Sequence, residues 1–170
     1  DFGAFAAVQG VGDALAACTR WPSRQDCEAR PMSVPKSLDI PDGVESRTLT
    51  TARSTFAAQI CQAQGERRGS ILLIPGWTGS KEDFTPILPL LAEIGYDVVT
   101  YDQRGQFESP GASDDDYSLS GFAADALSVA DETFPNEKFH LLGHSFGGLV
   151  AQTLAIEHPE RIRTLSLVCS

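Results

Sequence analysis

The 170-residue sequence has no apolar run close to the roughly 20 residues that a membrane-spanning helix requires. It also has no CxxC pair and no cysteine–histidine cluster with metal-ligand spacing, so no structural metal is expected. A Gly-Val-Gly at 10–12 lacks the third glycine and the preceding strand of a dinucleotide-binding turn. These absences argue against a membrane-spanning helix, a structural zinc site and a dinucleotide-binding turn at 10–12, and we expect no cofactor.

Positive charge is scarce as well. Thirteen Lys and Arg against 23 Asp and Glu give a formal net charge of -10. Because phosphate binding requires clustered Lys and Arg, nucleic acid and anionic membranes are not expected partners. The acidity is typical of a soluble protein. The acidic run at 114–116 lacks the alternating ligand spacing of a calcium loop, and we interpret it as a solvated loop.

The four cysteines do not identify a compartment. Cys18 and Cys27 are close enough in sequence to be paired. Cys61 and Cys169 fall in strand-like segments, where a free thiol is usually a small buried hydrophobe. The first residue is Asp rather than Met, which is compatible with removal of a signal peptide. The compartment therefore stays open, with the cytoplasm slightly favoured over secretion.

Residues 1–43 differ in character from the rest and are interpreted as an amino-terminal extension. The first part is rich in alanine, with apolar residues at loosely helical spacing, and predicts a helix that Gly10 and Gly12 weaken. Residues 19–43 contain four prolines and predict irregular chain running over a surface. Residues 44–170 form the second predicted unit.

In this second unit, strand-like and helix-like patterns alternate. Strands are predicted at 44–51, 54–64, 70–76, 96–102, 138–143 and 163–170, the first two as a hairpin, and helices at 81–95, 118–134 and 147–159. The prolines at 86 and 89 put the first turns of the first helix in doubt, and Ser118 or Ser120 caps the second. This order predicts an α/β fold: a mostly parallel, doubly wound sheet covered by helices on both faces.

The stretch FHLLGHSFGGLV, residues 139–150, contains a G-x-S-x-G motif between a predicted strand and a predicted helix. A turn this sharp strains its central residue, lifts the Ser145 hydroxyl clear of the sheet edge and aims the following helix N-terminus at an anion forming on a bound carbonyl. We predict Ser145 as a catalytic nucleophile; the alternative is a glycine-rich turn with an incidental serine. The side chain of His144 is expected to point away from Ser145, and the glycines to remove clashing Cβ atoms. The structural residues of this predicted elbow are Gly143, His144, Gly147 and Gly148.

A glycine-rich loop follows the preceding central strand, in LLIPGWTGSKEDF at 72–84. Ligand-facing loops of an open α/β sheet lie at the carboxyl ends of its strands, so this loop and the elbow should lie side by side. The backbone N–H groups of Trp77 and Phe146 could then form a two-donor oxyanion hole, in which loss of one donor typically costs about 2.7–4 kcal/mol. The alternative is a plain strand-to-helix turn in which Trp77 only packs.

Residues 44–170, about three quarters of the chain, resemble the amino-terminal half of an α/β-hydrolase. The resemblance implies that fold, Ser145 as nucleophile and the amides of Trp77 and Phe146 as oxyanion donors. The matching segments, in order, are LLIPGWTGSKEDF, VVTYDQRGQFESPG, YSLSGFAADALSVAD, FHLLGHSFGGLVAQTLAIEHPERI and TLSLVCS.

Two positions depart from the family pattern. Pro75 stands before the loop glycine, where the family usually has His, and backbone donation survives this change. Phe107 stands where the segment D-x-R-G-x-G-x-S usually has glycine. That segment is mostly structural in the family, so Asp102 and Arg104 are expected to form an ordering ion pair rather than to act as catalysts.

A serine nucleophile needs a base, and that base needs an orienting carboxylate. None of the three histidines, His140, His144 and His158, is expected to fill this role. In this fold the acid and the base follow the serine, after later strands. We therefore expect a hydrolase domain incomplete at its carboxyl end, inactive as this chain alone, with acid and base beyond residue 170 in a missing carboxyl-terminal half or a second chain.

Two hypotheses of different classes remain. The first is a serine hydrolase that cleaves an ester, amide or related acyl bond of a small molecule or peptide through an acyl-enzyme on Ser145. The segment DQRG at 102–105 resembles that of proline-releasing aminopeptidases, but also those of esterases and ring-cleavage hydrolases, so peptide hydrolysis stays open. The second is a non-catalytic, hydrolase-like binding module, favoured if the chain is complete, with an exposed edge at its last strand.

Overall fold

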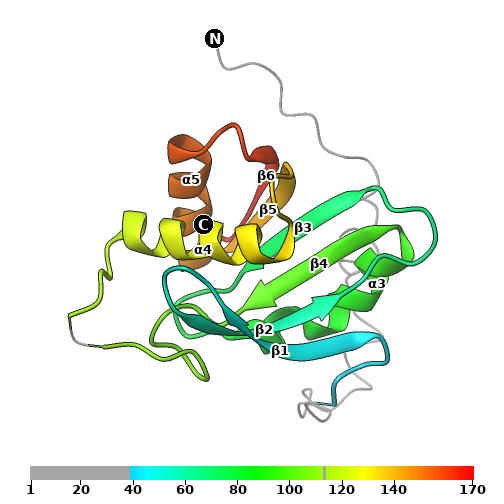
Figure 1. Cartoon of the computed structure of the whole chain (residues 1–170), viewed down its shortest axis with the longest axis horizontal. Coiled ribbons are helices and arrows are strands. Elements are labelled where there is room, and N and C mark those ends of the chain that lie inside the picture. Colours follow the sequence, from blue (N-terminus) through cyan, green and yellow to red (C-terminus); the bar gives the residue numbers. More distant parts are fainter. Residues whose placement is uncertain (1–38, 113) are drawn as a thin grey trace, which may run out of the picture.

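The computed structural model describes residues 39–112 and 114–170 (Figure 1). The predictions of an alanine-rich helix in 1–18, of irregular chain in 19–38 and of a Cys18–Cys27 pair lie outside the described residues.

Six strands form one sheet in the order β1-β2-β4-β3-β5-β6. β4, β3, β5 and β6 pair with one another in parallel, whereas β1 pairs antiparallel with β2 and β2 antiparallel with β4. The predicted hairpin and the predicted mostly parallel sheet are confirmed. The strands are β1 Val44–Thr50, β2 Thr55–Cys61, β3 Gly69–Ile74, β4 Tyr96–Tyr101, β5 Phe139–His144 and β6 Ile162–Val168.

Helices cover both faces of the sheet (Figure 1). One face carries η1 (Lys81–Ile87) and α3 (Leu88–Glu93), and the other carries α4 (Leu119–Thr133) and α5 (Phe146–Glu157). Successive side chains of the central strands point to opposite faces of the sheet and so belong to two different hydrophobic cores. Leu72 packs in the core on the α4–α5 side, and Leu73 packs in the core on the η1–α3 side. The sheet is therefore doubly wound, as predicted.

The single helix predicted over 81–95 is divided in the structure. Residues 81–87 form 3-10 turns with Pro86 inside them, and Pro89 lies in the first turn of α3. Proline lacks the N–H that an α-helix interior needs, which explains the division. Of the two candidate caps of α4, Ser118 is the one used: its hydroxyl accepts a hydrogen bond from the Gly121 N–H at 3.0 Å.

The two cysteines within the described residues differ in exposure. Cys61 is buried in β2, as predicted. The prediction for Cys169 was wrong, because this residue follows the last residue of β6 and is exposed. β6 is the edge strand of the sheet, and its end exposes Leu167 and Val168.

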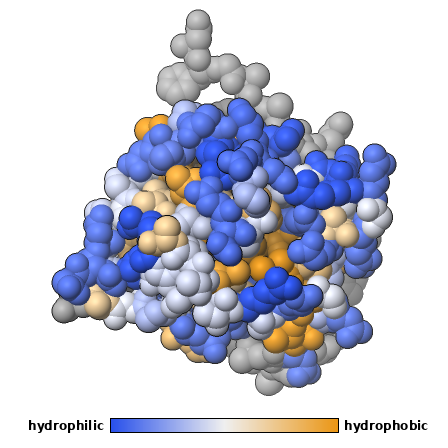
Figure 2. Space-filling view, in the orientation of Figure 1, coloured by the Kyte–Doolittle hydropathy of each residue, from blue (hydrophilic) through white to orange (hydrophobic). Residues whose placement is uncertain are grey.

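The view in Figure 2 shows a face of mostly hydrophilic side chains with small apolar areas between them. No helix among residues 39–112 and 114–170 combines the length and the apolar content that crossing a bilayer requires.

Candidate active site

Ser145 connects β5 to α5 with a strained backbone. It is the N-cap of α5, with φ 52° and ψ -120°, a region that residues other than glycine rarely adopt. Its backbone is held from two sides: the N–H donates to the Val168 carbonyl at 2.9 Å, and the carbonyl accepts from the Gly148 N–H at 2.9 Å. Within the described residues no group hydrogen-bonds the Ser145 hydroxyl. The strained backbone is the one predicted for the central residue of this turn.

The glycines around Ser145 are required by close backbone approach. A Cβ on Gly143 would overlap the Gly147 backbone, and a Cβ on Gly147 would overlap the carbonyl oxygens of Ile74 and Pro75. A Cβ on Gly148 would overlap the Ser170 side chain. Gly147 therefore lets the turn pack against the end of β3, and Gly143 lets the strand and the helix approach each other within the turn.

The loop after β3 lies beside the elbow, as the strand order predicts. A Cβ built on Gly76 would lie 3.4 Å from the Ser145 Cβ and 3.4 Å from His144 Nδ1. The rings of Trp77 and Phe146 meet edge to face, with centroids 5.0 Å apart. The two residues predicted as oxyanion donors thus come from different elements and contact each other.

Both predicted donor amides are free within the described part of the chain. Neither the Trp77 N–H nor the Phe146 N–H donates to a described backbone or side-chain acceptor. Phe146 is the first residue of α5, where an amide has no partner inside the helix. Both N–H groups therefore lack an acceptor among the described residues.

Two glutamines that the sequence analysis did not single out hold the loop. Gln103 Nε2 donates to the Pro75 carbonyl at 2.9 Å, and Gln106 Nε2 donates to the Trp77 carbonyl at 2.5 Å. Gln103 is fully buried. These pairs join residues 28 and 29 positions apart in the chain, so no local pattern could have found them.

The predicted Asp102–Arg104 ion pair was wrong. Asp102 is buried and binds Lys81 twice, accepting from its N–H at 2.8 Å and from Nζ at 3.0 Å. Glu82 and Glu108 also contact Nζ, at 2.9 and 2.5 Å. Burial lowers the pKa of Lys81, but hydrogen bonds to these three carboxylates outweigh it and hold the pKa above its ordinary value. The cluster fastens the start of η1 to the end of β4.

Arg104 has its own partners. Its guanidinium makes a bidentate pair with the buried Asp125 of α4, with both N–O distances 2.7 Å, and a 3.0 Å bond to Asp115. The Asp125 pair raises the pKa of Arg104 further, despite burial. The acidic run at 114–116 is therefore not wholly solvated as interpreted: Asp115 binds Arg104, and Asp116 accepts from the Ser118 N–H.

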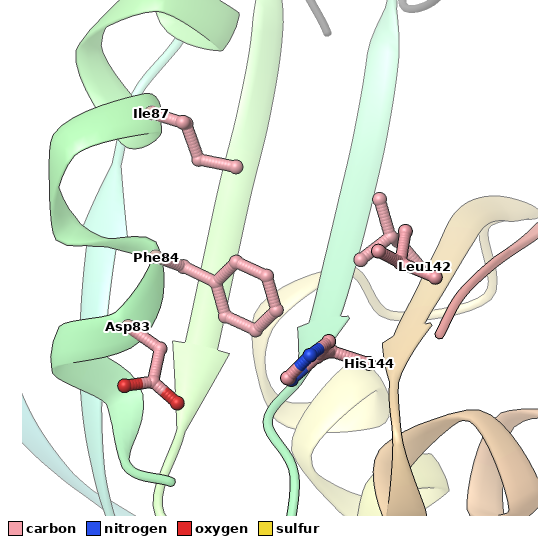
Figure 3. Close-up of a pocket in the computed structure, with 6 residues that line it drawn as sticks. Asp83, Phe84, Ile87, Leu142 and His144 are labelled. Carbon is pink, nitrogen blue, oxygen red and sulfur yellow. The ribbon is translucent and has the colours of Figure 1, made fainter. Parts of the chain in front are cut away.

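A pocket of about 360 Å³ opens on the η1 side of the sheet (Figure 3). Phe84 of η1 and His144 of β5 point into it from opposite walls (Figure 3). Ser145 is not among the residues that line it, which are Asp83, Phe84, Ile87, Leu142, His144 and Val168.

None of the three histidines hydrogen-bonds Ser145. His140 is buried and its Nδ1 lies 2.7 Å from Thr164 Oγ1, as expected of a packed strand residue. His158 ends α5 beside Glu160. Among residues 39–112 and 114–170, no group of three His, Cys, Asp or Glu side chains could hold a metal ion.

Comparison with curated proteins finds hydrolases. The chain is 41% identical over 106 residues to "Putative carbamate hydrolase RutD" of Variovorax paradoxus (strain S110), which covers 62% of this chain and 38% of that protein. It is 38% identical over 100 residues to a pimeloyl-[acyl-carrier protein] methyl ester esterase of Aeromonas hydrophila subsp. hydrophila, covering 59% and 37%. The matched region thus spans less than two fifths of these relatives.

Solved structures agree on the fold. An epoxide hydrolase from an endophytic Streptomyces superposes with a TM-score of 0.67 at 25% identity, covering 75% of this chain and 37% of that one. A membrane phospholipase A, described as a bacterial virulence factor, gives 0.66 at 25% identity, covering 74% and 39%. The family described as "alpha/beta hydrolase fold" matches residues 69–170. This chain therefore belongs to the α/β-hydrolase family.

Proposed function

We propose that the complete protein is a serine hydrolase that cleaves an ester, amide or related acyl bond through an acyl-enzyme on Ser145. The observation that carries this proposal is the strained backbone of Ser145, whose hydroxyl has no partner among the described residues and whose turn lies against the loop that carries Trp77. Such strain costs about 1–3 kcal/mol and persists where the surroundings over-determine it, often at functional sites.

In this mechanism the Ser145 Oγ attacks the substrate carbonyl carbon while its proton passes to a base. The carbonyl electron pair moves onto oxygen, and the N–H groups of Trp77 and Phe146 stabilise that oxyanion. Collapse of the intermediate expels the alcohol or amine with the proton, and water then hydrolyses the acyl-enzyme. The histidine base and its carboxylate would come from parts of the complete protein beyond residue 170, in keeping with the greater length of its relatives.

The substrate class follows from the nucleophile. A serine that opened an epoxide would form an ether, which water does not readily cleave, whereas acyl transfer gives an ester that is hydrolysed. The relatives named for carbamate and methyl ester hydrolysis act on acyl bonds. We therefore favour a small-molecule ester, carbamate or amide as substrate, with an aminopeptidase-like peptide bond as the alternative.

A fluorophosphonate probe tests the proposal. The complete protein, as its gene encodes it, should be labelled covalently, and mass spectrometry should place the label on the peptide that contains Ser145. Ser145→Ala should abolish labelling, whereas Ser128→Ala, on the remote helix α4, should leave it intact. An unlabelled, folded wild-type protein would favour the non-catalytic binding module instead.

A further inference from the structure

We infer that Gln103 and Gln106 are positioning residues that fix the direction of the Trp77 N–H, the proposed oxyanion donor of the β3 loop. The inference rests on the proposed function. It begins from the peptide units of this loop, which are rigid planes, so that fixing a carbonyl also fixes the N–H of the same unit.

Three consecutive carbonyls of the loop are held. The Gly76 carbonyl, in the same peptide unit as the Trp77 N–H, accepts from the Gly79 N–H at 3.2 Å. The unit before it is held through the Pro75 carbonyl by Gln103, and the unit after it through the Trp77 carbonyl by Gln106. Rotation of the central unit would therefore disturb its own hydrogen bond and the two that flank it.

The loop needs such restraint because of its sequence. Gly76 has no Cβ and would otherwise permit the Gly76–Trp77 peptide to turn over, which would reverse the direction of the Trp77 N–H. Pro75 fixes only its own φ, on the other side of Gly76. The Trp77 side chain is 61% exposed, so packing alone holds it weakly. The two carboxamides thus supply the restraint that the local chain lacks.

Among the described residues, the buried Gln103 side chain makes one hydrogen bond, to the Pro75 carbonyl. Its Nε2 must face Pro75, because a carbonyl only accepts, and its Oε1 is then buried without a partner among the described residues. An unsatisfied buried acceptor costs about 1–3 kcal/mol. Gln106 resembles Gln103, since its Nε2 donates to the Trp77 carbonyl and its Oε1 is also buried without a partner among the described residues.

The test compares Gln103→Leu and Gln106→Leu with Gln62→Leu, an exposed glutamine just after β2, in the complete protein. The fraction of competent sites is titrated with a fluorophosphonate, and turnover of p-nitrophenyl acetate is expressed per titrated site. We expect kcat to fall about 10- to 100-fold for the two site variants, with KM within twofold of wild type, since small misplacements can cost about 100-fold. The control should match the wild type.

A second readout separates positioning from folding. Affinity for a trifluoromethyl ketone, which forms the oxyanion, should fall with kcat, whereas the melting temperature of the half-exposed Gln106→Leu should stay within about 2 °C of wild type. Gln103→Glu can donate to Pro75 only when protonated, so its kcat relative to Gln103→Leu should rise at acidic pH.

The possible results separate the positioning inference from the hydrolase proposal on which it rests. Variants that keep the wild-type kcat and ketone affinity per titrated site, or lose only the titratable fraction, overturn the inference and leave the hydrolase proposal standing. A wild-type protein that is never labelled overturns both.

Discussion

Gly147 of α5 lies directly against the carbonyl of Ile74, the last residue of β3, with no room for a Cβ between them. This contact joins two segments that are far apart in the sequence and brings the elbow to the loop that follows β3. The backbone is the obstacle on both sides, so the approach cannot be relieved by moving a side chain.

Gly147→Ala should therefore destabilise the protein by at least about 2 kcal/mol, because the added methyl forces the elbow away from β3. Gly76→Ala is the matched control, since its Cβ would meet nothing closer than 3.4 Å, and it should cost about 1 kcal/mol or less. Denaturant unfolding of both variants measures the difference. Equal destabilisation would contradict the steric account.

Ser145→Gly should be more stable than Ser145→Ala by about 1 kcal/mol, while both lack activity. Glycine relieves the backbone strain at φ 52°, which outweighs its larger loss of entropy on folding. Thermal and urea unfolding of the two variants provide the comparison. An alanine variant as stable as the glycine variant would mean that the turn stores no strain.

Asp125→Asn should cost about 3 kcal/mol of unfolding free energy. It removes the buried carboxylate that Arg104 binds at two points and that Arg53 also binds, at 2.6 Å, so both guanidinium groups lose a charged partner. Glu45→Gln breaks the exposed pair with Arg47 and should change stability by less than about 1 kcal/mol. Equal effects would mean that the buried ion pairs of Asp125 contribute no more to stability than the exposed Glu45–Arg47 pair.

Because of the titration of His140, the free energy of unfolding should fall as the pH drops below 6.5. Burial, and secondarily the charge of Arg163, lower the pKa of His140, so the unfolded chain takes up a proton at a pH where the folded protein does not. The stabilising effect is present above pH 6.5, and it is lost as the pH falls toward the folded-state pKa. His140→Phe keeps an aromatic ring against Tyr96 but cannot take up a proton. The free energy of unfolding of this variant should therefore depend less on pH below 6.5. An unchanged slope in the variant would assign the acid sensitivity to other groups.

The strands, α4, α5 and the elbow could be predicted because each is encoded in contiguous residues. The apolar run of β3 predicts a buried strand, and the glycine and serine spacing at 143–148 predicts the elbow. The partners of Asp102 and Arg104 could not be predicted in this way. These two residues lie two positions apart, yet one binds Lys81 and the other Asp125, each 21 positions away.

The sequence by itself determined the alternation of strands and helices and the glycine pattern that lets Ser145 adopt its strained turn. Only the tertiary structure decided which side chains hold the loop beside it, because Gln103 and Gln106 reach that loop through the placement of β4 next to β3. Parallel neighbours in a sheet need not be neighbours in sequence, and their carboxyl ends converge only when crossovers place them together.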